Sequence, residues 1–343
     1  MMRLRNAECD MRNMGNAQRG MRTFPPPGAT TRKATPAIVL ENVSRWYGEV
    51  LGVNKVSVRI FSGITGLVGP NGSGKSTLMN VICGLLRPGQ GKVTVLGQPV
   101  WNNTELRRRI GYCTQVDHFY ERFSGLQFLE SLLAMHGRGK RWARNAALQA
   151  LARAGLSEDR DRPIRAYSKG MRQRVKIALA LAHQPETLVL DEPFNGLDPV
   201  GRHEMMQLFA DYAREGRTLL ISSHILHEIE QMTDRILMMS NGYVMAEGGV
   251  RDVRDELRRH PFRIFLRCND PRRLAALFIE QDAVMSAEIE DNAGLTLTTR
   301  DPDRFYTLLN EIVLRHRIEP DLVTLADENV QSIYLYLAGK EHH

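Results

Sequence analysis

Short apolar runs alternate with stretches of helical spacing along residues 37–249. An apolar run of a few residues bounded by turn residues is typical of a buried parallel strand, whereas apolar residues that recur every three to four positions indicate a helix. Because the two patterns alternate, the sequence predicts an α/β domain in which helices cover a largely parallel sheet. The strands expected in this sheet are residues 64–68, 110–114, 187–190 and 218–221, with an Asn-Gly hairpin between 236–239 and 243–246.

Two further regions are added to this pattern. Residues 38–60 contain short segments of strand-like alternation, so we expect a small β layer before the strand at 64–68. Residues 116–165 carry two apolar stripes at helical spacing and are expected to form a helical insertion. The aromatic residues at 118–123 that open this insertion fit either a core or a docking surface. The two stripes are Phe128, Leu129, Leu132 and Leu133, and then Ala147, Leu148, Leu151 and Leu156.

Residues 262–340 show a different order of elements. Their pattern predicts strand, helix, two strands, helix, strand and a short final helix over 330–338, which is the order of a ferredoxin-like βαββαβ module. Because no catalytic group set is found there, we expect an accessory α+β domain with a regulatory or interaction role. Residues 1–36 have no apolar periodicity and are rich in Arg and Pro, so they are expected to form a disordered basic tail.

Net charge, the length of apolar runs and cysteine spacing indicate which class of protein this is. Of the net charge of +7, residues 1–36 supply most, with seven Lys or Arg against two acids, and the rest is near neutral. We therefore expect no nucleic-acid partner, although contact of the tail with anionic lipid or nucleic acid stays open. No apolar run approaches the 18 or more residues of a membrane span, and the four cysteines lack paired spacing. A cytoplasmic protein with reduced thiols is expected.

A glycine-rich loop between the strand at 64–68 and a following helix carries the strongest chemical signal. Its pattern Gly-x-x-x-x-Gly-Lys-Ser/Thr predicts a phosphate-binding loop, because glycines let backbone N–H groups approach phosphate oxygens and the helix adds its positive end. Lys75 is expected to bridge the β- and γ-phosphates, and Ser76 to offer its hydroxyl to Mg²⁺. The residues of the loop are Gly69, Pro70, Asn71, Gly72, Ser73, Gly74, Lys75, Ser76 and Thr77.

Polar side chains follow the neighbouring strands where these end. Asp191 and Glu192 come directly after the apolar run at 187–190, and two acids there are costly unless they have a function. We expect Asp191 in the Mg²⁺ shell and Glu192 as the base that orients or deprotonates water. Gln115 and His224 follow the strands at 110–114 and 218–221, so the same edge of the sheet receives an amide and an imidazole.

A third signal is the start of a helix at 168. Ser168 occupies an N-cap position before a helical pattern, with the small residue Gly170 behind it. A helix start with free N–H groups binds anions, although a plain capped helix is the favoured interpretation when these residues are considered alone.

Taken in order, these segments resemble the ATPase domain of ABC transporters over residues 38–248. The order of seven features is far more specific than any single motif. The features are an aromatic loop at Tyr47, Walker A at residues 69–77, a Gln loop at Gln115, a signature at residues 167–174, Walker B at residues 188–192, a D-loop ending at Asp198 and Pro199, and a switch histidine at His224.

The resemblance implies a specific assembly and chemistry. It implies a P-loop ATPase that hydrolyses ATP with Mg²⁺ in a head-to-tail homodimer, each ATP lying between one phosphate loop and the partner's signature. In that arrangement Tyr47 stacks on the base, Ser168 and Gly170 face the γ-phosphate, and Gln115 shares the metal shell with Ser76 and Asp191. The signature departs from the usual Leu-Ser-Gly-Gly-Gln, because Lys169 replaces a glycine.

This Tyr-Ser-Lys-Gly-Met version is similar to that of stand-alone ATPase subunits of exporters. We therefore expect a subunit on the cytoplasmic face of the membrane that energises a separate permease and contacts the membrane mainly through it. One alternative is a soluble ABC ATPase of translation or DNA repair, although such proteins usually carry two ATPase domains or coiled coils. Another is a non-enzymatic ATP sensor, against which Glu192 and His224 argue.

Overall fold

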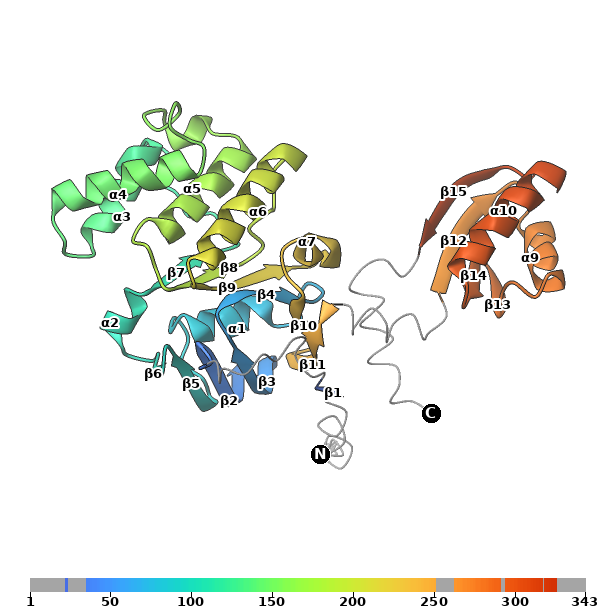
Figure 1. The fold of residues 1–343 in the computed structure, drawn as a ribbon, viewed down its shortest axis with the longest axis horizontal. Helices are drawn as coiled ribbons and strands as arrows, with labels where there is room; N and C mark the ends of the chain where they lie inside the picture. The colour runs from blue at the N-terminus through green and yellow to red at the C-terminus, as the bar shows by residue number, and fades with distance from the viewer. Residues whose placement is uncertain (1–21, 24–34, 251–261, 291–293, 317, 326–343) are drawn as a thin grey trace, which may run out of the picture.

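The computed structural model describes residues 22–23, 35–250, 262–290, 294–316 and 318–325 (Figure 1). The first domain is built on a seven-stranded sheet with the order β1-β11-β10-β4-β9-β8-β7. β4, β7, β8, β9 and β10 form the parallel part of this sheet, as the apolar runs predict. The strands are β1 (Arg22–Thr23), β4 (Gly63–Val68), β7 (Ile110–Cys113), β8 (Thr187–Leu190), β9 (Thr218–Ser223), β10 (Arg235–Ser240) and β11 (Tyr243–Gly249).

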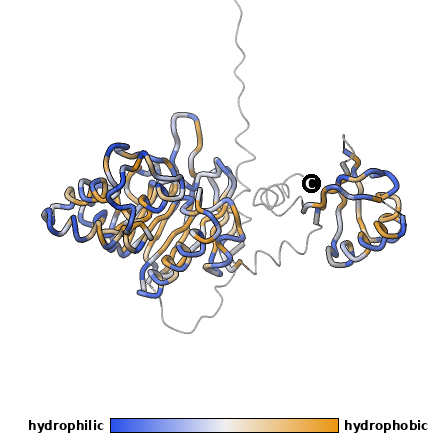
Figure 2. The backbone as a smooth tube through the Cα atoms, turned by 90° about the horizontal axis from the view of Figure 1, so that it is seen from above, coloured by the Kyte–Doolittle hydropathy of each residue, from blue (hydrophilic) through white to orange (hydrophobic). Residues whose placement is uncertain are grey.

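The expected β layer is an antiparallel sheet with the order β3-β2-β5-β6. Helix α1 (Lys75–Ile82) packs between it and the central sheet, because one hydrophobic cluster contains Leu78 of the helix, Ile38 of the layer and Leu67 of the central sheet. Figure 2 shows hydrophobic segments along the inner strands and hydrophilic segments at the outer loops. The strands of the layer are β2 (Ile38–Tyr47), β3 (Val50–Ile60), β5 (Gln90–Val95) and β6 (Gln98–Pro99).

The insertion is helical, as expected. α3 (Gly125–Ala134), α4 (Lys140–Arg153) and α5 (Lys169–Leu181) share one hydrophobic cluster. Helix α3 begins at Ser124 with a capping box: the Ser124 hydroxyl accepts the Gln127 N–H, and the Gln127 side chain accepts the Ser124 N–H. Three short elements complete the first domain: α2 (Thr104–Arg107) packs against β7, η2 (Ile164–Ala166) precedes α5, and α7 (Leu226–Glu230) packs against β9 and β4.

The aromatic residues that open the insertion divide between core and surface. Phe119 packs against the cluster of the lobe, whereas Tyr120 and Phe123 remain 57% and 39% exposed. On the face of the central sheet opposite to α1, α6 (Pro199–Arg214) buries Phe209 and Tyr212 against β8 and β9 in a cluster that also includes residues of α5. The long helix α6 has no counterpart among the elements that we expect from the sequence.

The two ends of the first domain carry local signals of different strength. Asn241 and Gly242 have φ values of 45° and 82°, which are the left-handed values that a two-residue hairpin requires, as predicted. In the tail, the structure describes Arg22–Thr23, which pair with β11. The rest of residues 1–34 lies outside the described residues.

The second domain has the predicted order of elements. Its sheet order, β13-β14-β12-β15, is antiparallel throughout, as in a ferredoxin-like module. Its hydrophobic cluster contains only residues between Ile264 and Ile318, so it has a core of its own. The helix expected at 330–338 lies outside the described residues. The elements are β12 (Phe262–Cys268), α9 (Pro271–Glu280), β13 (Ser286–Glu290), β14 (Gly294–Thr299), α10 (Pro302–His316) and β15 (Pro320–Leu325).

Two further observations concern the cysteines and possible membrane spans. Cys83, Cys113 and Cys268 are buried free thiols, and Cys9 lies outside the described residues. Burial raises the pKa of the Cys113 thiol to about 12, which keeps it protonated and unreactive. In the part of the chain that the structure describes, no helix has both the length and the apolar composition that a membrane span needs.

The separate core of the second domain makes its stability testable. Phe278 is fully buried and stacks on Phe305 with ring centroids 4.6 Å apart. Phe278→Ala should cost about 3–5 kcal/mol of unfolding free energy and abolish the melting transition of this domain in calorimetry of the whole chain. The control Ile279→Ala changes a neighbour that is 57% exposed and should leave both transitions in place. An equal loss of stability in the first domain would contradict the independence of the two cores.

Candidate functional site

The glycine-rich loop connects β4 to α1 and closes tightly on itself. Gly72 and Gly74 have φ values of 81° and 100°, a left-handed conformation that side chains rarely adopt. A Cβ on Gly74 would lie 2.3 Å from the Gly52 carbonyl oxygen, and a Cβ on Gly69 would lie 2.3 Å from that of Met239. Only glycine fits at these two positions, because backbone atoms crowd both.

The tip of the β10–β11 hairpin supports this loop from the side. The Gly242 N–H donates to the Ser73 carbonyl at 3.0 Å, and the Asn54 N–H donates to the Gly242 carbonyl at 2.8 Å. The Ser73 hydroxyl is buried and has no hydrogen-bond partner among the described residues. The loop is therefore fixed by backbone contacts, while one of its hydroxyl groups is left without a protein partner.

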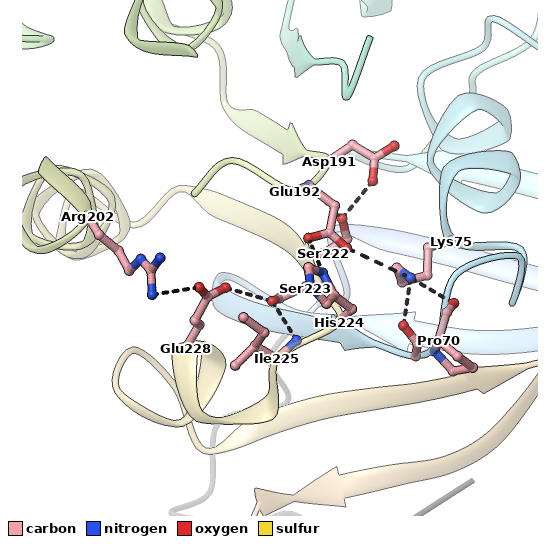
Figure 3. A network of polar contacts seen from close by, with 11 residues as sticks. Pro70, Lys75, Asp191, Glu192, Arg202, Ser222, Ser223, His224, Ile225 and Glu228 are labelled. Atoms are coloured by element: carbon pink, nitrogen blue, oxygen red, sulfur yellow. Dashed lines mark hydrogen bonds and ion pairs between the residues drawn. The ribbon is translucent and has the colours of Figure 1, made fainter. Parts of the chain in front are cut away.

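Lys75 lies inside the loop and is only 7% exposed. Its ammonium group donates to the carbonyl oxygens of Gly69 at 2.7 Å and Pro70 at 3.0 Å, and Glu192 Oε1 lies 3.9 Å away (Figure 3). Burial lowers the pKa of Lys75, and the negative charges of Glu192 and Asp191 partly oppose that shift. Lys75 thus lies beside the two acids that follow β8. The sequence predicts this proximity, because the loop and the acids follow strands that end at one edge of the sheet.

Asp191 and Glu192 are joined by a residue of the next strand. The Ser222 hydroxyl, at the end of β9, donates to Asp191 Oδ1 at 2.7 Å and accepts the Glu192 N–H at 2.8 Å. Asp191 is 1% and Glu192 5% exposed. No role for Ser222 was predicted from the sequence. Its position at a strand end, two residues before His224, was the signal that could have marked it as a site residue.

His224 binds the second carboxylate. Its Nδ1 lies 2.9 Å from Glu192 Oε2, whereas Glu192 Oε1 is buried and lacks a hydrogen-bond partner among the described residues. Glu192 also has a φ of 50°, which is rare for a residue with a side chain and marks a backbone held in place by its surroundings. The arrangement leaves one carboxylate oxygen directed to the lysine side of the site and the other fixed by the imidazole (Figure 3).

Two aromatic residues precede the loop, Trp46 and Tyr47, and Tyr47, the expected stacking residue, is the one beside α1. Its hydroxyl lies 3.5 Å from Thr77 Oγ1, and its ring is 44% exposed. Trp46 instead lies over Gly89, since a Cβ there would be 3.6 Å from the indole ring. A ring that is open to solvent beside the phosphate loop is what base stacking requires.

The remaining predicted residues do not meet the loop within one chain. Gln115 follows β7, which pairs with β8. It is therefore at the sheet edge that carries Asp191 and Glu192, and it is exposed. Ser168 caps α5 by accepting the Met171 N–H at 3.2 Å, and Asp198 caps α6 by accepting the Gly201 N–H at 3.0 Å. Among the described residues, no hydrogen bond or ion pair joins Ser168, Gly170 or Asp198 to the loop at 69–77.

Two polar features elsewhere do not belong to this site. The Glu228 carboxylate accepts the Ser223 hydroxyl at 2.7 Å and pairs with Arg202 at 3.1 Å, so it supports α7 and α6. A cavity of about 420 Å³ includes Arg109 and lies at the amino end of β7, opposite to the end that carries Gln115. Its lining residues are Gln98, Glu105, Leu106, Arg108, Arg109, His136, Gly137 and Arg138.

Comparisons with known proteins point to one family. The family model described as ABC transporter matches residues 53–195. The chain is 35% identical over 242 residues to an uncharacterized ABC transporter ATP-binding protein of Nostoc sp., which covers 67% of this chain and 72% of that protein. It is 30% identical over 314 residues to the daunorubicin/doxorubicin resistance ATP-binding protein DrrA of Streptomyces peucetius, which covers 89% of this chain and 93% of that protein.

Solved structures agree on the fold of the first domain. A dimeric bacterial ABC transporter cassette has a TM-score of 0.59 and 30% identity, covering 62% of this chain and 99% of that chain. A dimeric cassette in a post-hydrolysis state with ADP and phosphate has a TM-score of 0.58 and 29% identity, with the same coverage. The α/β architecture with a phosphate loop is confirmed, and nucleotide binding and ATPase activity follow from it. The chain belongs to the family of ABC transporter ATP-binding proteins.

Proposed function

We propose that two copies of this chain bind and hydrolyse Mg-ATP and thereby energise a separate membrane permease that exports its cargo. The observation that carries the proposal is the buried pair of Lys75 and Glu192 beside the glycine loop, with the partly exposed His224 bound to Glu192. Such a set has the positive charge, the base and the imidazole that phosphoryl transfer to water requires. The location on the cytoplasmic face, through the permease, is part of the proposal.

The residues present fit a magnesium nucleotide. Serine hydroxyl, carboxylate and amide oxygens are the hard ligands that Mg²⁺ prefers, and Ser76, Asp191 and Gln115 would supply them. Ser73 Oγ and Glu192 Oε1 are buried without hydrogen-bond partners among the described residues, so the hydroxyl can donate to a phosphate oxygen and the carboxylate oxygen can accept from a water. When bound, Mg²⁺ supplies charge neutralisation at the phosphates.

The chain's own groups then divide the reaction. Lys75 exchanges its two loop carbonyls for β- and γ-phosphate oxygens, and its buried ammonium neutralises charge that develops there. Glu192 accepts a proton from the attacking water as the water oxygen bonds to the γ-phosphorus and the bond to ADP breaks. His224 holds Glu192 Oε2 in position during this transfer. ADP and phosphate are the products.

The second half of each site comes from the partner copy in this proposal. Ser168 and Gly170 start α5 on the helical lobe and contact no phosphate-loop residue in the described part of their own chain, which fits a role toward the other protomer. Asp198 at the start of α6 is placed in the same way. The dimeric state of related cassettes supports this arrangement.

The names of related proteins support export. They include bacitracin transport, lantibiotic transport and Nod factor export ATP-binding proteins. In this chain Tyr120 and Phe123 are exposed at the start of the helical lobe and offer an apolar contact for a permease. Purification of the tagged chain from a detergent extract should recover one membrane protein with several spans. Recovery of ribosomal or DNA-repair proteins in its place would contradict transport.

Removal of the base should separate binding from hydrolysis. We expect Glu192→Gln to keep ATP binding and to lower kcat about 10²- to 10⁴-fold, because the amide cannot accept the proton of water. The variant should accumulate as an ATP-held dimer in size-exclusion chromatography with Mg-ATP. Glu186→Gln, which changes an exposed carboxylate paired with Arg109, is the control and should keep activity. Absence of a dimer for Glu192→Gln would count against the model.

Removal of the lysine should weaken ATP binding itself. Lys75→Ala deletes a buried charge that faces the phosphates, a loss of about 2–5 kcal/mol, or roughly 30-fold to several thousand-fold in ATP affinity. Fluorescence titration with a labelled ATP analogue measures the change. Lys92→Ala removes an exposed lysine of β5 and should bind as the unaltered chain does. Equal affinity of Lys75→Ala and the unaltered chain would refute the assigned site.

A further inference from the structure

Helix α5 carries a buried lysine, Lys176, for which no role was predicted from the sequence. Lys176 is 9% exposed, although ammonium groups are normally kept in water. Its Nζ lies 2.7 Å from Asp117 Oδ1 and donates to the Gln115 carbonyl oxygen at 3.0 Å. Both contacts are made to the short segment that follows β7, which contains the proposed metal ligand Gln115.

The burial of Lys176 is informative because it is costly. An apolar side chain at this position of a packed helix would avoid the desolvation penalty of the ammonium group. The penalty is offset only when Asp117 and the Gln115 carbonyl take up their observed positions. The charge therefore selects one placement of the segment, whereas an apolar residue would allow several.

The same face of α5 holds this segment at a second point. Arg172 lies one helical turn before Lys176 and donates to both carboxylate oxygens of Glu121 at 2.7 and 2.9 Å. The stretch 115–121 is thus attached to α5 by two ion pairs. It follows that a movement of α5 moves this stretch with it.

Helix α5 is also attached to the segment that follows β8. Gln173 donates to the Pro193 carbonyl at 2.9 Å. The apolar stem of Lys169 covers Gly196, where an added Cβ would lie 2.6 Å from Lys169 Cγ. The helix that begins at Ser168 therefore supports the segments on both sides of the carboxylate pair.

We propose that Lys176 is a positioning residue that ties Gln115 to the helix bearing Ser168. This inference rests on the proposed function, in which Gln115 serves the nucleotide of its own chain and Ser168 that of the partner. The tie makes the placement of Gln115 in one site depend on whether α5 is engaged with the other. Lys176 acts through Gln115 and touches no nucleotide.

The test breaks the ion pair from either side. Lys176→Met removes the buried charge, and Asp117→Asn removes its partner at a position that is 43% exposed and so tolerates substitution. In both variants we expect faster amide hydrogen exchange in residues 114–121 without nucleotide. We also expect a three- to tenfold higher Mg²⁺ concentration for half-maximal ATPase activity, with little change in KM for ATP. The charge-swapped pair Lys176→Asp with Asp117→Lys should restore both values in part.

A matched control and three distinct contradicting outcomes complete the test. Arg109→Met breaks an ion pair of 2.6 Å at the other end of β7 and should leave the Mg²⁺ requirement unchanged. Faster exchange with an unchanged Mg²⁺ requirement in both variants would overturn the role of Lys176 while the proposed function stands. Unchanged exchange would overturn the tie itself. An unaltered chain without Mg²⁺-dependent hydrolysis would overturn the proposed function and this role together.

Discussion

Two adjacent buried carboxylates at the end of β8 are the constraint on which the rest of the site depends. Asp191 and Glu192 are nearly inaccessible to water, and a buried charge is stable only with close partners. Two neighbouring elements supply the partners: α1 brings the Lys75 ammonium to 3.9 Å from Glu192 Oε1, and β9 with the residue after it brings Ser222 and His224. Because parallel strands all end at one edge of the sheet, residues far apart in the chain converge there.

The same constraint explains why the backbone around the site is so tightly held. Lys75 can stay buried only while the carbonyls of Gly69 and Pro70 are turned toward it. The hairpin tip at Gly242 fixes the loop from one side through Ser73. The shape of the loop is thus set by backbone contacts that only glycine permits, and its charge by a lysine and two acids.

Features with a local cause could be predicted from the sequence, and those that depend on distant partners could not. The apolar run of β8 and the Asn241–Gly242 turn carry their own signals, so both were predicted. Ser222 has meaning only beside Asp191, and Lys176 only beside Asp117. β1 could not be predicted because it pairs with a strand more than two hundred residues later. Helix α6 was missed although Asp198 at its N-cap and Pro199 in its first turn are local signals.

Lys169, which stands where the resembled family has a glycine, changes the packing around the start of α5. Gly196 has a φ of 80° and leaves open the space into which the aliphatic stem of Lys169 fits. A glycine at position 169 would leave that surface uncovered. The stem thus packs the start of α5 against Gly196 within one chain, while residue 169 stays exposed. In the proposed dimer a positive charge at this helix start is favourable near a polyanion, so Lys169 is compatible with the proposed role of Ser168 toward a phosphate.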